Sequence, residues 1–144
     1  MNTIDPSAKT LNSLLRGELS AIETYNQALH KFADSPVVSS LRTIRDDHQE
    51  SVSMLRSLVQ MRGVEPETDS GVWGTFAMAV EGTAALLGSS SAIIALKQGE
   101  EHGIGQYEDA IEDEELPLDV REVLVRNLLP RLQSHVASLN GLVS

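Results

Sequence analysis

The sequence predicts an all-α fold, a four-helix bundle with one additional helix that crosses over between the second and third main helices. Aromatic residues make up only 3% of the 144 residues, while Leu, Ala, Glu and Ser abound, and this composition favours helices packed by aliphatic side chains. Four long segments carry apolar residues at alternating steps of three and four, as one face of a helix requires. A Gly-Glu motif occurs in both the first and the third of these segments.

The first helix is expected at about residues 6–33, where Asp5 can cap the N-terminus and Pro6 suits the first turn. Its seam is of the kind that packs helices nearly antiparallel, and one acidic residue, Glu18, interrupts it. The other members of the seam are Leu11, Leu15, Ile22, Tyr25, Leu29 and Phe32.

The second helix is expected to open at Ser35-Pro36, again as cap and first turn, and to end at Gly63. The short link to the first helix makes the two helices antiparallel neighbours. Its seam also carries polar residues, because Arg45 and His48 are three apart and therefore lie on one face. The acidic run around His48 adds at most one ligand, since consecutive helical residues point in different directions.

After a loop at residues 64–70, an apolar segment at about 71–87 is predicted to form a helix. At 1.5 Å per residue it would span roughly 25 Å, about the length of a bundle. A helix of that length can return the chain along the bundle, so that the second and third main helices run parallel. The alternative is a lid packed against one open end of the bundle.

The third main helix is expected at about residues 90–115, before the break at Leu116-Pro117. The fourth is expected from 117 or 118 to 142. Pro130 lies inside this helix and has no N–H, so the sequence predicts a kink there and a freed carbonyl near Arg126.

One pattern relates the first and third helices at an offset of 82 residues. Each copy reads Gly-Glu, three residues, Ile, two residues and Tyr, and it contains either Glu18 with Tyr25 or Glu100 with Tyr107. Each copy is followed by a helix with one histidine on its apolar stripe. We therefore expect one Glu and one His from each helix pair to converge on a buried site, formed by Glu18, His48, Glu100 and His135.

Over nearly its whole length, the chain resembles the ferritin-like superfamily of four-helix bundles. Within that superfamily it resembles a bacterial family of small bundles that is defined only as a domain of unknown function. The Gly-Glu segment that ends at Tyr107, the Leu116-Pro117 break and His135 carry this closer resemblance. The resemblance implies a ferritin-like bundle and an intracellular protein related to stress or storage.

The resemblance also implies where metal ligands would stand. Ferritin-like bundles hold two iron or manganese ions with one Glu from each of two helices and a Glu-x-x-His from each of the other two. These six positions fall on Glu18, Arg45, His48, Glu100, Leu132 and His135. Arg45 and Leu132 replace two carboxylates, which leaves two divalent ions undercharged, and the guanidinium adds repulsion. The sequence therefore argues against a standard di-iron centre.

Three functions stay open. The leading interpretation is a ferritin-like protein of unassigned role, without a cofactor, in which Arg45 pairs with Glu18 or Glu100 inside a metal-free buried network. The second is a mononuclear site for iron, manganese or zinc, formed by two Glu and two His, in a metal-binding protein or an oxidoreductase. The third is a helical interaction module that forms a homodimer through an exposed apolar crossover surface.

Tyr25 and Tyr107 are interpreted as core aromatics whose hydroxyls find a polar partner across the bundle. The alternative makes them redox or hydrogen-bonding neighbours of a metal. Under either interpretation, the repeated pattern indicates common descent or symmetry and is not by itself evidence of a chemical function.

Charge and composition exclude several classes of protein. A net charge of −10 disfavours nucleic acids and anionic membranes as partners. The absence of cysteine excludes disulfides, iron–sulfur clusters and a thiol nucleophile.

The N-terminal residues lack the basic and apolar regions of a signal peptide, and we expect a cytoplasmic protein. No phosphate loop, nucleophile elbow or His-Glu-x-x-His motif is present, so the sequence names no catalytic residue.

Overall fold

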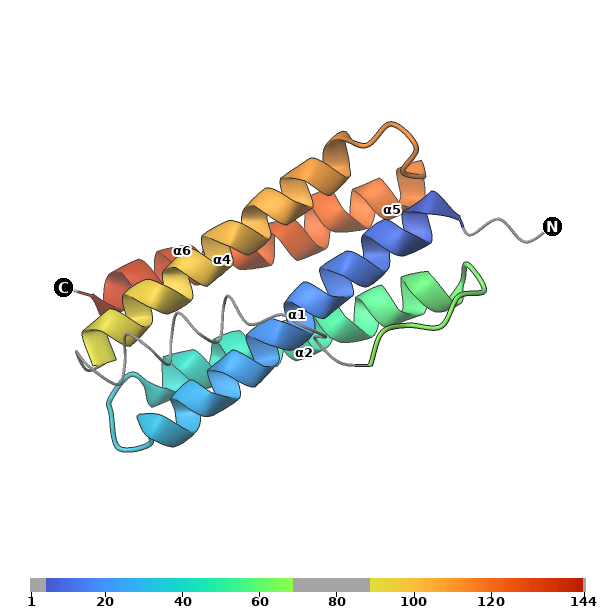
Figure 1. The fold of residues 1–144 in the computed structure, drawn as a ribbon. Coiled ribbons are helices and arrows are strands. Elements are labelled where there is room, and N and C mark those ends of the chain that lie inside the picture. Colours follow the sequence, from blue (N-terminus) through green and yellow to red (C-terminus); the bar gives the residue numbers. More distant parts are fainter. Residues whose placement is uncertain (1–4, 69–88, 144) are drawn as a thin grey trace.

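A computed structural model describes residues 5–68 and 89–143, and every regular element in these ranges is a helix. One antiparallel pair consists of α1 (Pro6–Lys31) and α2 (Val38–Gln60). The other pairs α4 (Ser89–Glu112) with a rod made of α5 (Leu118–Val123), the π-helix η1 (Leu124–Leu128) and α6 (Leu129–Leu142). The four rods lie side by side, so the described residues form a four-helix bundle (Figure 1). None of the described helices is both long enough and apolar enough to cross a membrane.

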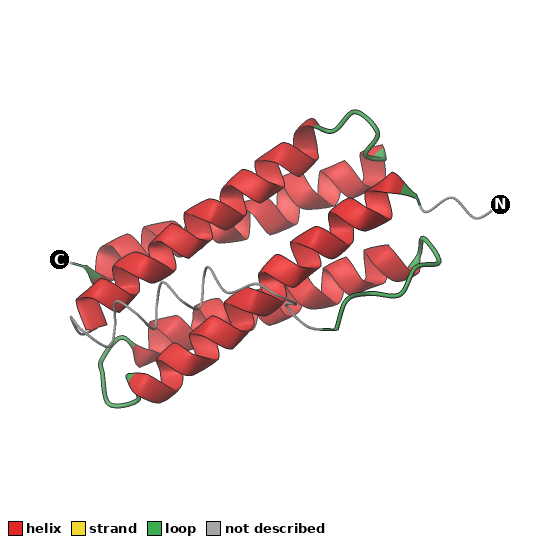
Figure 2. Ribbon diagram, in the orientation of Figure 1, coloured by secondary structure: helices red, strands yellow, loops and turns green. Residues whose placement is uncertain are grey.

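The two pairs are arranged so that α2 and α4 run in the same direction, while α1 and α6 run the opposite way (Figure 1). The turn that joins α1 to α2 and the turn that joins α4 to α5 therefore lie at opposite ends of the bundle (Figure 2). This parallel course of α2 and α4 agrees with the prediction. The helix expected at 71–87, and with it the apolar surface expected to form a homodimer, lies outside the described residues.

The helix ends agree only partly with the prediction. Asp5 caps α1 as expected, because its carboxylate accepts the N–H of Ser7 at 2.9 Å. The expected cap at Ser35 is wrong: α2 begins at Val38, and the Ser35 hydroxyl instead accepts the N–H of Val37 within the preceding turn. At its C-terminus α4 ends three residues early, because the Asp113 carboxylate accepts the N–H of Glu115 in a turn.

Pro130 is accommodated by a wider turn of helix. The five residues directly before α6 form the π-helix η1, in which the N–H of Leu129 donates to the carbonyl of Leu124, five residues back. π-Helices are rare and occur mostly as single turns inside α-helices, frequently at functional sites. The irregularity predicted at this proline is therefore present as a π-helical turn, and His135 follows it on α6.

The core consists of two apolar clusters stacked along the bundle, with a polar layer between them. The first cluster includes Leu15, Leu55, Tyr107 and Leu128, and the second includes Tyr25, Ile44, Leu96 and Leu139. On every rod, one buried acidic or imidazole side chain stands between the residues of the first cluster and those of the second. These four side chains are Glu18, His48, Glu100 and His135. The polar layer is thus shielded from water at both ends of the bundle.

Candidate functional site

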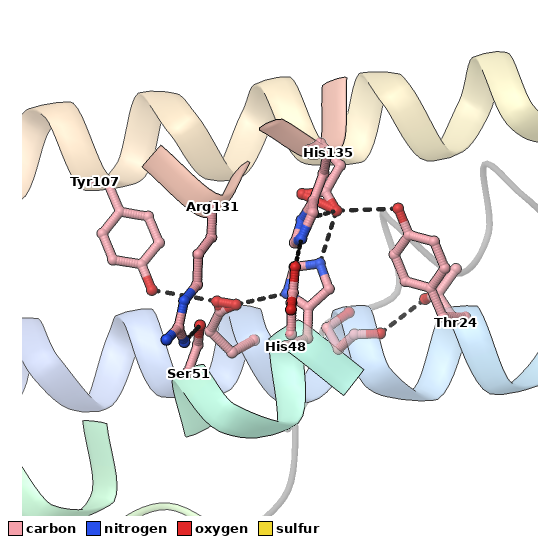
Figure 3. Close-up of polar contacts among 11 residues, drawn as sticks. Thr24, His48, Ser51, Tyr107, Arg131 and His135 are labelled. Atoms are coloured by element: carbon pink, nitrogen blue, oxygen red, sulfur yellow. Dashed lines mark hydrogen bonds and ion pairs between the residues drawn. The ribbon is translucent and has the colours of Figure 1, made fainter. Parts of the chain in front are cut away.

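The four predicted side chains meet in the middle of the bundle, each from a different rod and each at most 3% exposed. His48 Nδ1 lies 2.6 Å from Glu18 Oε1, and His48 Nε2 lies 2.7 Å from Glu100 Oε1. His135 Nδ1 approaches the same Glu100 oxygen at 3.1 Å. The two imidazole rings point towards one another from the neighbouring helices α2 and α6 (Figure 3), with their centroids 4.8 Å apart. We call these residues, together with Asp47, the buried cluster.

Each tyrosine of the repeat binds the glutamate of the other copy. The Tyr25 hydroxyl donates to Glu100 Oε1 at 3.0 Å, and the Tyr107 hydroxyl donates to Glu18 Oε2 at 3.2 Å. This crossing follows from geometry, because helical side chains lean towards the N-terminus and α1 and α4 are antiparallel. The prediction that both tyrosines are core aromatics with a polar partner across the bundle is confirmed.

Asp47 belongs to the cluster although the sequence did not single it out. Its Oδ2 atom lies 2.8 Å from His135 Nε2, and its side chain is 41% exposed. Asp47 therefore connects the buried imidazole to the surface. The only signal in the sequence was the acidic run around His48, in which one neighbour was expected to share the face of the histidine.

Arg45 lies outside the cluster, and its predicted pairing with Glu18 or Glu100 is wrong. Its guanidinium donates instead to Asn26 Oδ1 at 2.7 Å and to Asp46 Oδ1 at 3.0 Å. Asn26 stands eight residues beyond Glu18, roughly 12 Å along α1. The side chain thus leans away from the polar layer and keeps 24% of its surface in water, which avoids the desolvation of a buried guanidinium.

Two more residues flank the cluster on the side of Tyr107. Arg131 stands one helical turn before His135 on α6, and its Nη1 atom donates to the hydroxyl of Ser51 at 3.1 Å (Figure 3). Its other terminal nitrogen lies 3.5 Å from Glu50. Neither Arg131 nor Ser51 was predicted from the sequence, although Arg131 is four residues from His135 and Ser51 is three from His48, which places each on the same helix face as its histidine. Leu132, at the other substituted ligand position, is an apolar core residue.

The cluster holds opposite charges next to each other in a dry interior. Burial disfavours a charged His48, but the charges of Glu100 and Glu18 and their hydrogen bonds outweigh burial and raise the pKa of His48 well above its usual value. Burial also opposes ionisation of Glu100, yet the charge of His48 and the bonds from both histidines lower the pKa of Glu100 to about 2. Near neutral pH these groups are therefore an imidazolium and a carboxylate.

Burial also keeps the two tyrosines protonated. It raises the pKa of Tyr25 well above the usual value, and the negative charge of Glu100 raises it further. The same two causes, burial and then the charge of Glu18, raise the pKa of Tyr107. Both hydroxyls thus remain hydrogen-bond donors to the carboxylates.

Three residues of the cluster could hold a metal ion. His48, Glu100 and His135 each offer one ligand atom, and these atoms lie within 4.8 Å of one another. Glu100 Oε1 is already shared by three partners, whereas Glu100 Oε2 is buried and has no hydrogen-bond partner among the described residues. An unsatisfied buried carboxylate oxygen next to two imidazoles is a donor set that suits a divalent cation. The residues present therefore fit one ion.

Comparison with known proteins identifies a family and gives no function. The model of a family described as a domain of unknown function, DUF2383, matches residues 7–113. Searches of curated proteins and of solved structures gave no match. The matched range includes Glu18, His48 and Glu100, whereas the Leu116-Pro117 break and His135, which also carried the resemblance, lie beyond it. Because the match covers more than half of the 144 residues, the chain belongs to the DUF2383 family.

Proposed function

We propose that the protein binds one divalent transition-metal ion through His48, Glu100 and His135. One observation carries this proposal: the nitrogens that face Glu100 converge on it, while the other nitrogen of each ring is held by a different carboxylate. Metal-binding histidines in proteins almost always donate their second N–H to a carboxylate or a carbonyl, which fixes the orientation of the ring. Glu18 supplies this contact for His48, and Asp47 supplies it for His135.

The charge of the cluster supports the proposal. The His48 imidazolium lies between the side chains of Glu18 and Glu100, so the proton on its Nε2 atom faces the ionised Glu100. A divalent ion that displaces this proton keeps a positive charge next to Glu100, and its binding releases the proton.

The donor set favours certain metals. Two imidazoles and one carboxylate form the three-ligand set of catalytic zinc sites and of non-haem iron(II) sites, both of which keep open coordination positions. Soft thiolate ligands are absent from the sequence, which disfavours copper(I). We therefore expect zinc, iron or manganese.

We also propose that the bundle is of the ferritin-like kind and that its centre derives from a dinuclear one. The glutamates on α1 and α4, the histidines on α2 and α6, and the parallel course of α2 and α4 support this assignment. Arg45 and Leu132 stand where the two further carboxylates would be needed. The loss of these carboxylates leaves ligands for a single ion.

The alternative function is a metal-free network that fixes the packing of the four helices. It is supported by the completeness of the contacts, because all four ring nitrogens of the cluster already have a carboxylate partner. The unsatisfied Glu100 Oε2 favours the metal site over this alternative.

Titration calorimetry with Zn²⁺, after removal of metal by a chelator, distinguishes the two functions. A metal site predicts one equivalent of Zn²⁺, with binding lost in His135→Ala. Asp47→Ala removes only the outer partner of His135, so its affinity should fall by roughly 10- to 100-fold. His30→Ala and Asp46→Ala serve as matched controls, because both residues are exposed, and they should bind like the wild type. Wild-type protein that binds no Zn²⁺, or equal binding in His135→Ala, would leave the metal-free network as the function.

A further inference from the structure

A small cavity connects the buried cluster to the seam between α1 and α4. Its volume is about 20 Å³, enough for about one water molecule. The inner wall is formed by buried side chains, including Glu18, His48 and Glu100. The outer wall is formed by half-buried or exposed residues, including Gly17 and Gln106. The cavity therefore extends from the ligands towards the surface.

An open groove of about 310 Å³ lies outside this cavity on the same seam. The groove and the cavity share two lining residues, Leu14 and Gln106, so they adjoin at that point. Two carboxylates, Asp109 and Asp113, line the groove. A cation on this face thus meets two negative charges at the surface, an amide at the junction and the buried carboxylates within.

The junction depends on a residue without a side chain. A Cβ atom added at Gly17 would lie 3.1 Å from Gln106 Oε1, which is closer than most real contacts of this kind. Glycine therefore leaves room for the end of the Gln106 side chain at the mouth of the cavity. An added Cβ at Gly105, on the same α4 helix, would meet nothing within 4 Å.

We propose that divalent cations reach the buried cluster along the α1–α4 seam, from Asp109 and Asp113 past Gln106 to Glu100. This inference rests on the proposed metal site and names its route of entry. The surface carboxylates attract the hydrated ion, and the amide oxygen of Gln106 replaces part of its water at the mouth of the cavity, which has room for about one water molecule. Glu100 Oε2, which has no partner among the described residues, is the first free ligand within. On the opposite side, the ring of His135 stands between Asp47 and Glu100.

The rate of Co²⁺ uptake by the metal-free, full-length protein tests this route. We expect the double variant D109N/D113N to take up Co²⁺ about three- to tenfold more slowly at low ionic strength, and this difference to shrink in high salt. The matched control is E108Q/E112Q, which removes the same charge from exposed positions in the last turn of α4 and should stay within about twofold of the wild type. Equilibrium affinity should be unchanged in both pairs, because none of the four residues is a ligand.

A second pair of variants tests the junction itself. Gly17→Leu should slow uptake at every salt concentration, whereas Gly105→Leu, placed in open space, should not. Equal slowing by the two acidic pairs, or unchanged rates in both D109N/D113N and Gly17→Leu, would overturn the route alone. Wild-type protein that takes up no Co²⁺ would overturn the metal site and the route together. If Gly17→Leu does not fold, the two acidic pairs decide the outcome.

Discussion

Glu100→Ala is expected to lower the free energy of unfolding of the metal-free protein by about 3–5 kcal/mol. Glu100 Oε1 accepts three hydrogen bonds, from Tyr25, His48 and His135, and the residue is only 1% exposed. Its removal leaves an imidazolium and a tyrosine hydroxyl without their shared acceptor in a dry interior, where unpaired polar groups are costly. Chemical denaturation in the presence of a chelator measures the effect without any contribution from bound metal.

Two further variants show whether the loss of stability in Glu100→Ala comes from the buried carboxylate. Glu101→Ala changes the next residue, which is exposed, and should stay within about 0.5 kcal/mol of the wild type. Glu100→Gln retains an acceptor oxygen in the same shape and should cost less than Glu100→Ala. A loss below about 1 kcal/mol in Glu100→Ala would mean that this carboxylate does not hold the four helices together.

The stability of the metal-free protein should depend on pH on both sides of a plateau. The pKa of Glu100 falls from 4.5 to about 2 on folding, so its contribution is complete above pH 4.5 and is lost as the pH drops towards 2. That difference corresponds to roughly 3 kcal/mol. His48 has a raised pKa in the folded protein, so its contribution is complete below pH 6.5 and is lost as the pH rises towards the raised value. Both shifts describe one ion pair, so the two contributions are not summed.

Comparison of variants isolates these contributions from those of the other carboxylates. The difference in unfolding free energy between wild type and Glu100→Ala should shrink as the pH falls from 4.5 to 2. The corresponding difference for Glu101→Ala should stay near zero throughout. A wild-type advantage over Glu100→Ala that is constant across this range would contradict the ion pair between Glu100 and His48.

The sequence predicted those parts of the site that depend on helix periodicity. Glu18, His48, Glu100 and His135 interrupt otherwise apolar seams, and a seam position faces the core in any antiparallel bundle. The antiparallel pairs and the parallel course of α2 and α4 follow from short links and from the length of the connection between these two helices. The crossed bonds of the tyrosines follow from the same periodicity, since each stands two turns beyond a glutamate.

The parts that failed depend on how far a side chain reaches between helices. Arg45 shares a face with His48, but its long side chain leans towards the N-terminus of α2 and donates hydrogen bonds to Asn26 and Asp46. Asp47 reaches His135 only because α6 lies at a particular distance from α2, and the periodicity of apolar residues in the sequence does not predict the distance between helices. The sequence predicted a kink at Pro130, whereas the residues before this proline form a π-helical turn, because either irregularity can accommodate the missing N–H.

Anomalous diffraction from crystals of the wild-type protein soaked with Zn²⁺ tests the buried metal site most directly. The proposed metal site predicts one strong peak inside the bundle, at about 2.0–2.2 Å from a nitrogen of His48, a nitrogen of His135 and an oxygen of Glu100. A saturating soak that leaves this position without a peak, or that gives peaks only at the acidic surface of residues 108–115, would contradict it.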